Sequence, residues 1–174
     1  AYTTGSCGNG IGKSPEAREV VKVMLESSLP LVLDADGLNN ICSHPEWLCR
    51  KAPLILTPHA KEFSRLSGFE ISEILSNPFA CARSFLQTHP DAVLVLKSSW
   101  TLTASKEGWW FLNAPNSALA KGGSGDVLSG IITGLLAQGY SPAKAAVLGV
   151  WLASASASSG KSCPWSWTPL QTAG

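Results

Sequence analysis

The stretch PLVLDAD (residues 30–36) carries the pattern on which the fold depends. Three consecutive apolar residues follow a proline, and two aspartates lie at the end of the stretch. A short continuous apolar run is typical of a strand that is buried on both faces of a parallel sheet. The pattern returns in LILTPH (54–59) and in AVLVLK (92–97). We therefore predict three buried strands, each with polar residues at its carboxyl end.

Helical patterns separate these strands. SPE (14–16) supplies an N-cap, a first-turn proline and a first-turn acid, and the apolar residues after it keep helical spacing as far as Ser27–Ser28. Further helical pattern begins at Lys61, stops near Gly68, and resumes over 71–87 with a break at Asn77-Pro78. Strands that alternate with helices predict an α/β fold with a mostly parallel central sheet. The segments Thr101–Ala104 and Trp109–Leu112, joined by a glycine-containing turn, predict a hairpin.

Polar side chains collect at the carboxyl ends of the predicted strands. They are Asp34, Asp36, His59 and Lys97. Ligands of open α/β sheets bind beyond this edge of the sheet, so these residues are candidates for a site. The alternative is that strand ends are simply where the chain leaves the core and becomes polar.

Composition limits the class of protein. The chain has 174 residues, 45% of them hydrophobic, which is enough for one domain with a substantial core. Its net charge of +1 gives no basic surface of the kind that binds nucleic acid. No apolar run is long enough to cross a membrane, and the first residues lack the pattern of a signal peptide, so we expect a soluble, cytoplasmic protein. Its five cysteines and three histidines do not have the spacing of a zinc site.

GNGIGKSPE (8–16) looks at first like a phosphate-binding P-loop. The P-loop pattern requires a glycine where this chain has Cys7, and Pro15 is better suited to the first turn of an ordinary helix. Two interpretations remain open. The segment is either a glycine-rich turn between a strand and a helix, or a turn whose glycines let a ligand approach the backbone closely.

KGGSGD (121–126) is the better candidate for a phosphate site. It precedes an apolar helical pattern, Val127 through Gln138, which Gly139 ends. Glycines at the start of a helix leave backbone N–H groups free to bind an anion, and the helix dipole favours negative charge there. Asp126 would then lie beside the bound phosphate, where a carboxylate can accept the proton of an attacking hydroxyl. The alternative is a glycine-rich loop whose aspartate only caps the helix.

Five separated segments together resemble the NAD(P)H-hydrate dehydratases, a family of the ribokinase-like superfamily. NSALAKGGSGDVLSG (116–130) is similar to the family signature, GNGIG (8–12) to its GPGLG turn, VLDADGLN (32–39) to VLDADALN, LTPHAKEF (56–63) to LTPHPGEF, and VLKSSWT (95–101) to VLKGxxT. The resemblance covers about residues 8–152. It implies a three-layer ribokinase-like fold, and it locates the nucleotide phosphate at Gly122–Gly125 and the substrate near Gly10.

The resemblance also implies the activity. Members remove water from hydrated NADH or NADPH by phosphorylating the ring hydroxyl, with ADP or ATP as co-substrate and Mg2+ at the nucleotide phosphates. In this chain Asp126 matches the catalytic base, and Gly10, His59 and Asp126 match substrate contacts. The positions that match nucleotide contacts are Lys97, Ser98, Ser99, Trp100, Thr101, Gly122, Gly123, Ser124 and Gly125. The serine of GGSGD and the residues Ala118–Lys121 resemble the ADP-using bacterial branch.

The chain departs from the family pattern in several places. Asn9 replaces a proline of the GPGLG turn, and Ser98 replaces the glycine that follows Lys97. Full-length members begin with further strand–helix units, so we expect an incomplete domain over residues 1–152. The segment 153–174 has no helical period and is interpreted as an atypical tail.

Two other functions remain open at this stage. The chain could be a ribokinase-like kinase that phosphorylates a small hydroxyl compound and stops there. It could also be a truncated remnant that binds nucleotide without turnover. The family tends toward symmetric assemblies, which makes a homo-oligomer one option.

Overall fold

The structure is a computed structural model that describes residues 3–113, 123–156 and 168–169. The strands are β1 (Gly5–Cys7), β2 (Leu31–Leu33), β3 (Leu54–Leu56), β4 (Ala92–Lys97), β5 (Thr101–Ser105), β6 (Gly108–Leu112) and β7 (Thr168–Pro169). The helices are α1 (Pro15–Glu26), α2 (Ala35–Ile41), α3 (Ala60–Ser67), α4 (Ile71–Ser76), α5 (Pro78–Thr88), α6 (Ser124–Ala137), α7 (Pro142–Ser156) and the 3-10 helix η1 (Pro45–Leu48).

Within the described residues the strands form one seven-stranded sheet, in the order of the sequence. Strands β1 to β4 are parallel, and β5, β6 and β7 extend the sheet with antiparallel pairing. Leu33 of β2 pairs with Cys7 of β1 and with Leu56 of β3, so the carboxyl ends of these strands lie level at one edge. The predicted α/β fold is confirmed, and so is the predicted hairpin, which forms β5 and β6.

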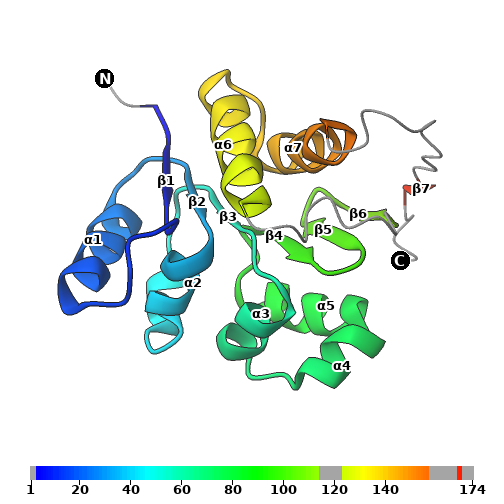
Figure 1. The fold of residues 1–174 in the computed structure, drawn as a ribbon, viewed down its shortest axis with the longest axis horizontal. Helices are drawn as coiled ribbons and strands as arrows, with labels where there is room; N and C mark the ends of the chain where they lie inside the picture. The colour runs from blue at the N-terminus through cyan, green and yellow to red at the C-terminus, as the bar shows by residue number, and fades with distance from the viewer. Residues whose placement is uncertain (1–2, 114–122, 157–167, 170–174) are drawn as a thin grey trace.

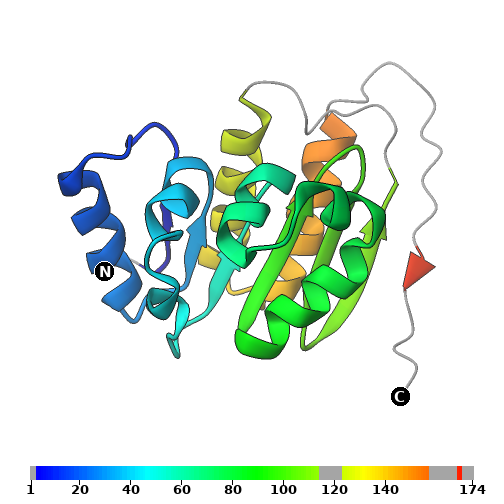
Figure 2. The same cartoon turned by 90° about the horizontal axis from the view of Figure 1, so that it is seen from below.

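Helices cover both faces of the sheet and give the fold three layers. Helices α1 to α5 lie on one face, whereas α6 and α7 lie on the other (Figure 1). Figure 2 shows the same division from below, with α6 and α7 behind the strands.

The alternation of side chains along each parallel strand explains why both faces are covered. Successive strand residues point to opposite faces, so each strand contributes to two cores. The leucines that pack beneath α1 to α5 are Leu31, Leu33, Leu54, Leu56, Leu94 and Leu96. The β-branched residues that pack against α6 and α7 are Val32, Ile55, Val93 and Val95. All ten are buried, and each stabilises the fold by about 1.5–3 kcal/mol relative to an exposed side chain.

The second core depends on close packing between two helices. A Cβ atom added at Gly149 of α7 would lie 2.5 Å from Cγ1 of Ile132 of α6. Alanines at positions 143, 145 and 146 complete the narrow face of α7. Small residues therefore allow α7 to pack closely against α6.

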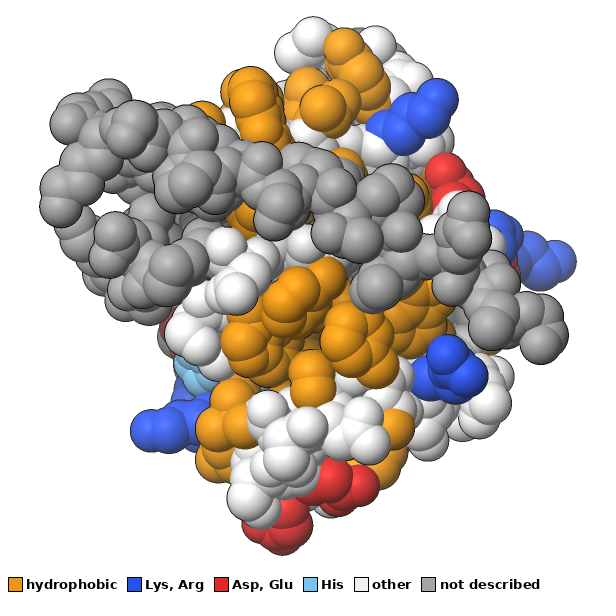
Figure 3. Space-filling view, turned by 90° about the vertical axis from the view of Figure 1, so that its right-hand side faces the viewer, with side chains coloured by type: hydrophobic (Ala, Val, Ile, Leu, Met, Phe, Trp, Pro, Cys, Tyr) orange, Lys and Arg blue, Asp and Glu red, His pale blue; other side chains and the backbone are white. Residues whose placement is uncertain are grey.

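The β6 side of the sheet has an aromatic cluster. Phe79 of α5 contacts Trp109 and Phe111 of β6, with ring centroids 6.3 Å and 5.6 Å away, and Trp100 contacts Phe111 at 5.7 Å. Hydrophobic side chains gather on this side of the molecule (Figure 3). The cluster extends the core that lies beneath α1 to α5.

Several helix boundaries follow the local signals in the sequence. The Ser14 side chain accepts a hydrogen bond from the Ala17 N–H at the start of α1, and Gly68 ends α3 with a φ of +81°. Asn77 separates α4 from α5, where the pattern predicted a break. Helix α6 begins at Ser124, three residues before the predicted start, and Gly139 follows it with a φ of +89°.

Some features were not predicted. The polar segment after β2 forms α2, whose first turn contains Asp36, and η1 follows it. The predicted boundary between residues 152 and 153 falls inside α7, which continues to Ser156. Residues 157–167 and 170–174 of the predicted tail lie outside the described residues.

Candidate functional site

The polar residues predicted at the strand ends lie at one edge of the sheet. Asp34 follows β2, His59 follows Thr57 and Pro58 at the end of β3, and Lys97 is the last residue of β4. The backbone continues to pair beyond β3, because His59 and Lys97 form an isolated parallel bridge and the Lys97 N–H donates to the Pro58 carbonyl at 2.8 Å. The structure therefore brings these side chains to the edge where α/β proteins bind ligands.

Asp34 is the most enclosed of them. Asp34 as a whole residue is 3% exposed. Oδ1 of its carboxylate accepts hydrogen bonds from the Ala35 N–H and from Lys97 Nζ, both at 2.9 Å. The hydroxyl of Ser129 in α6 donates to Oδ2 at 3.0 Å. Ala35, the next residue, has a φ of +45°, a conformation that is uncommon for a residue with a side chain. Strained backbone of this kind is concentrated at functional sites.

The first turn of α6 lies against this carboxylate. A Cβ atom added at Gly125 would be 3.0 Å from Asp34 Oδ2 and 3.7 Å from Lys97 Nζ, so only glycine leaves the Asp34–Lys97 pair undisturbed. Gly123 is the N-cap of the helix and has a φ of +83°. Backbone N–H groups at the start of a helix bind anions, and here they lie next to an ammonium group. Gly122, which the sequence also assigns to the nucleotide, lies outside the described residues.

Asp126 is the third residue of α6 and is exposed. Its carboxylate makes no hydrogen bond or ion pair with the residues that the structure describes. One residue of an α-helix turns about 100°, so Asp126 lies on the flank of the helix when Gly125 faces Asp34. An exposed carboxylate beside an anion site can accept a proton from an incoming hydroxyl group.

His59 caps α3. Its Nδ1 accepts a hydrogen bond from the Glu62 N–H at 3.1 Å, while Glu62 Oε2 accepts one from the His59 N–H at 2.9 Å. This reciprocal arrangement is a capping box. Since Nδ1 is an acceptor, the neutral ring has its proton on Nε2, which lies 3.4 Å from Glu62 Oε1. The side chain is 51% exposed, so the capping box fixes the orientation of a ring that remains accessible.

The predicted nucleotide segment, residues 97–101, is the turn between β4 and β5. Lys97 pairs with Thr101 across the strands, and the Ser98 N–H donates to the Trp100 carbonyl at 2.7 Å. Thr101 is buried and Ser99 is exposed. Only part of this segment is therefore accessible to a ligand.

The glycine-rich turn after β1 is held by α2. The Asp36 carboxylate accepts from the Gly12 N–H at 3.1 Å, and the Asn40 amide donates to the Gly12 carbonyl at 2.9 Å. Gly8 packs so closely that a Cβ atom there would lie 1.8 Å from the Asp34 carbonyl oxygen. Gly10 is different, because it has a φ of +71°, is exposed, and has open space where a Cβ would be. The turn thus has a structural role at Gly8 and an accessible backbone at Gly10.

Sequence reasoning overlooked Ser129 and left Asp34 out of the assigned site. Ser129 is 1% exposed, on the buried side of a mainly apolar helix, four residues after Gly125. Residues four apart share a helix face, so a serine four residues after a glycine of the predicted phosphate site is the signal that could have identified it.

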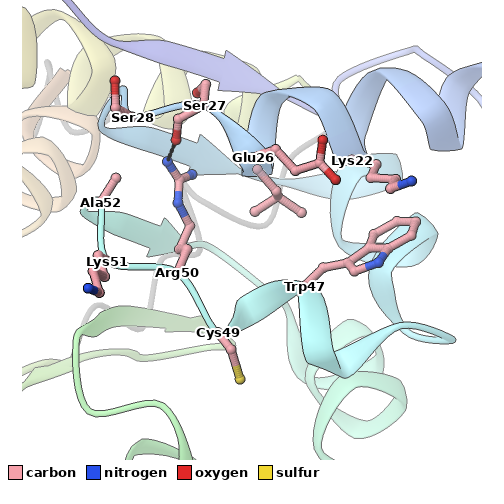
Figure 4. Close-up of a pocket in the computed structure, with 10 residues that line it drawn as sticks. Lys22, Glu26, Ser27, Ser28, Trp47, Cys49, Arg50, Lys51 and Ala52 are labelled. Carbon is pink, nitrogen blue, oxygen red and sulfur yellow. Dashed lines mark hydrogen bonds between the residues drawn. The ribbon is translucent and has the colours of Figure 1, made fainter.

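A separate cavity of about 380 Å³ lies at the opposite end of the strands. It is lined by Lys22 and Glu26 of α1, Trp47 of η1, and residues 49–52 ahead of β3 (Figure 4). Arg50 Nη2 donates to the carbonyls of Ser27 and Leu29, both at 2.7 Å, and so satisfies backbone groups near the end of α1. Burial lowers the pKa of the Arg50 guanidinium. This cavity is remote from the predicted site residues.

Two further findings apply to the described part of the chain alone. None of its helices has the length and apolar content that crossing a membrane requires. Its histidine, cysteine and acidic side chains form no group of three that could hold a metal ion.

Comparison with known proteins identifies the fold first. The structure superimposes on a ribokinase-like superfamily protein from Enterococcus faecalis with a TM-score of 0.74 and 26% identity, covering 86% of this chain and 52% of that one. The fold is therefore ribokinase-like. A sequence model of the NAD(P)H-hydrate dehydratase family matches residues 2–172, and the chain belongs to this family.

Two relatives agree with this assignment. An ADP/ATP-dependent NAD(P)H-hydrate dehydratase from Bacillus subtilis, co-crystallised with ATP and Mg2+, has a TM-score of 0.75 and 31% identity over 89% of this chain and 55% of its own. A bifunctional NAD(P)H-hydrate repair enzyme from Coxiella burnetii is 41% identical over 158 residues, which are 90% of this chain and 32% of that protein. The chain thus spans about a third of the curated relative and about half of the solved one.

Proposed function

We propose that this chain takes part in the nucleotide-dependent dehydration of hydrated NADH or NADPH. The observation that carries the proposal is the contact between the first turn of α6 and the Asp34–Lys97 pair, next to the exposed carboxylate of Asp126. An anion site with an adjoining base is what phosphoryl transfer to a hydroxyl group requires. Family membership supplies the substrate class.

In the proposed reaction Asp126 accepts the proton of the ring hydroxyl while that oxygen attacks the terminal phosphate of the nucleotide. The C–O bond then breaks, phosphate leaves, and the lone pair of the ring nitrogen stabilises the cation that forms. Loss of a proton from the neighbouring ring carbon restores the dihydronicotinamide. Phosphorylation is needed because hydroxide is a poor leaving group. The products are NAD(P)H, phosphate, and AMP from ADP or ADP from ATP.

The other predicted residues have supporting roles in this proposal. Backbone N–H groups of Gly123, Ser124 and Gly125 bind the phosphate that is transferred, together with the Lys97 ammonium. His59 and the accessible backbone at Gly10 contact the hydrated cofactor. The accessible part of the remaining 97–101 turn contacts the nucleotide, as does Gly122.

We expect Mg2+ to bind together with the nucleotide rather than at a site formed by the described residues alone. Mg2+ is commonly held by one or two carboxylates plus substrate phosphates, so a cage of protein ligands is not required. Asp126 is the exposed carboxylate nearest in sequence to the phosphate-binding glycines, whereas both oxygens of Asp34 already accept hydrogen bonds. When bound, the ion would neutralise phosphate charge.

ADP is the co-substrate we favour, on the resemblance of GGSGD and its preceding residues to the ADP-using branch. Cytoplasmic location, a homo-oligomer, and the division into a domain of residues 1–152 and a tail of residues 153–174 also stay predictions. Because the chain spans part of its relatives, the activity must be tested on this polypeptide itself.

The direct test gives the purified chain hydrated NADH or NADPH with Mg2+ and either ADP or ATP. Recovery of the dihydronicotinamide absorbance, with one phosphate released per cofactor repaired, supports the proposal. Accumulation of a stable phosphorylated substrate would instead favour a small-molecule kinase. Saturable nucleotide binding without either product would favour a nucleotide-binding remnant, and a faster reaction with ATP would contradict the preference for ADP.

A further inference from the structure

Asp34, Lys97 and Ser129 form a hydrogen-bonded group that joins three separate elements. Lys97 Nζ and Ser129 Oγ contact different oxygens of the Asp34 carboxylate, at 2.9 Å and 3.0 Å. Asp34 is the N-cap of α2, Lys97 belongs to β4, and Ser129 belongs to α6. Their side chains are enclosed: Asp34 is 4% and Lys97 is 11% exposed, and Ser129 as a whole residue is 1% exposed. Asp34 and Ser129 both lie in segments that resemble the family, but neither is among the catalytic, substrate or nucleotide contacts assigned from the sequence.

The Lys97 ammonium retains donors for a ligand. An ammonium has three N–H donors, and Asp34 is its one hydrogen-bond partner among the described residues. Lys97 Nζ lies 3.7 Å from the position that a Cβ of Gly125 would occupy, so the ammonium borders the first turn of α6. A lysine beside helix N–H groups is suited to phosphate, which it binds as a compact point charge.

The ion pair between Lys97 and Asp34 is unfavourable at a phosphate site in two respects. A carboxylate close to a phosphate repels it, and a buried ion pair adds little stability of its own once desolvation is counted. The function of the pair is therefore to position the Lys97 side chain rather than to stabilise the fold. A lysine side chain has many rotamers, and a fixed acceptor 2.9 Å away selects the one that points toward α6.

Ser129 extends this arrangement to the helix itself. It lies one turn after Gly125 on the same face of α6, and its hydroxyl holds the helix to the carboxylate that also holds Lys97. The relative position of the ammonium and the first-turn N–H groups is therefore set by one side chain, that of Asp34.

We propose that Asp34 and Ser129 are positioning residues, which hold the Lys97 ammonium and the start of α6 in register so that both contact the same nucleotide phosphate. This inference deepens the proposed function and rests on it. Asp34 acts through Lys97 and through α6 rather than by touching the nucleotide. Lys97 contacts phosphate and not the adenosine part of the ligand.

The test compares ADP with adenosine, because only ADP has the phosphate. Binding of both is measured by calorimetry, with adenosine as a competitor, in the wild-type chain and in Asp34→Asn, Lys97→Met and the double variant. We expect each single change to weaken ADP binding by about tenfold or more, as for the loss of a charge-assisted hydrogen bond, and to leave adenosine binding unchanged. In the Lys97→Met background, Asp34→Asn should weaken ADP binding by less than about twofold, since coupled residues are not additive.

The control is an ion pair at the opposite end of β4. Lys106 Nζ lies 2.6 Å from Asp91 Oδ1, and both side chains are more than half exposed. Asp91 immediately precedes β4, whereas Lys97 ends it. Asp91→Asn and Lys106→Met make the same charge changes and should leave ADP affinity as it is in the wild-type chain.

Ser129→Ala provides a milder variant in case Asp34→Asn does not fold. It should weaken ADP binding several-fold with adenosine unaffected, and this loss should vanish when Lys97 is methionine. Equal losses for ADP and adenosine, or effects that add across the cycle, would overturn the positioning role alone. Unfolding of both the Asp34 and Ser129 variants would do the same, because the group would then be a structural one. Absence of saturable ADP binding by the wild-type chain would overturn this inference together with the proposed function.

Discussion

Asp34 and Lys97 lie 2.9 Å apart although their strands are not neighbours in the sheet. Strand β3 lies between β2 and β4 in the sheet, and its last residues are buried. The contact between Asp34 and Lys97 therefore crosses the carboxyl end of β3. The two residues are 63 positions apart in the sequence. The parallel register places the last residues of β2 and β3 level with Leu94, and β4 continues three residues further to Lys97. The start of α6 lies at the same edge, where Gly125 and Ser129 contact the Asp34 carboxylate.

Gly125 should be intolerant of a single methyl group. Gly125→Ala would place a Cβ 3.0 Å from Asp34 Oδ2, and such overpacking costs about 1–3 kcal/mol. We expect ADP affinity to fall by about tenfold, which corresponds to about 1.4 kcal/mol. Calorimetric titration with ADP measures this.

Gly130 offers the matched change on the same helix. A Cβ there would meet nothing within 4 Å. Gly130→Ala should leave ADP affinity unchanged and raise the free energy of unfolding by about 0.5–1 kcal/mol, because alanine has the better helix propensity. Equal ADP affinities for the Gly125 and Gly130 variants would show that the first turn of α6 does not border the phosphate.

Two variants of His59 should distinguish its role in capping α3 from its role in binding the substrate. His59→Ala removes the side-chain acceptor for the Glu62 N–H and should lower the free energy of unfolding by about 1 kcal/mol. His59→Asn supplies another good N-cap and should retain most of that stability. Both variants lack the imidazole, so we expect KM for the hydrated cofactor to rise in both.

Denaturant unfolding and steady-state kinetics on the two variants measure these effects. A wild-type KM in His59→Asn would mean that His59 serves the helix and does not contact the substrate.

His89 should make stability depend on pH. Its ring lies 4.6 Å from that of Phe85, and its buried Nδ1 has no hydrogen-bond partner among the described residues. Burial lowers the pKa of His89 below its ordinary value of 6.5. The unfolded chain therefore binds the proton more readily, and the free energy of unfolding decreases as the pH falls through 6.5 toward the lower pKa of the folded state.

His89→Gln cannot be protonated and should remove this part of the pH dependence. Urea unfolding of both proteins at about pH 7.5 and about pH 5.5 measures the difference. If the two proteins lose the same free energy of unfolding over that interval, His89 does not contribute.

Local pattern was sufficient for much of the fold. The apolar runs that contain Leu31–Leu33, Leu54–Leu56 and Ala92–Lys97 became parallel strands, because a segment apolar at every position can only be buried on both faces. Helix α2 was not predicted, since DGLNN has few apolar residues and its start depends on the Asp34 side chain. Its contacts are with the glycine turn, through Gly12, and with Lys97, which binds its N-cap Asp34, and both partners are distant in sequence.

The candidate site was predictable to the extent that it is local in sequence. Glycines and an aspartate at the start of α6 are visible in six consecutive residues. The partners of Asp34 are not, because Lys97 and Ser129 are 63 and 95 residues away and meet it only in the folded sheet. The capping role of His59 was also hidden, since histidine is not among the usual N-cap residues.

Asp126 carries the central chemical claim, and its most direct test is turnover by Asp126→Asn. We expect kcat for recovery of NAD(P)H from its hydrate to fall by about 10²–10⁴-fold, because a general base is lost, while ADP still binds. Asp91→Asn, the same change at the opposite end of the sheet, should keep the wild-type rate. An Asp126→Asn chain that repairs the hydrated cofactor at the wild-type rate would contradict the account.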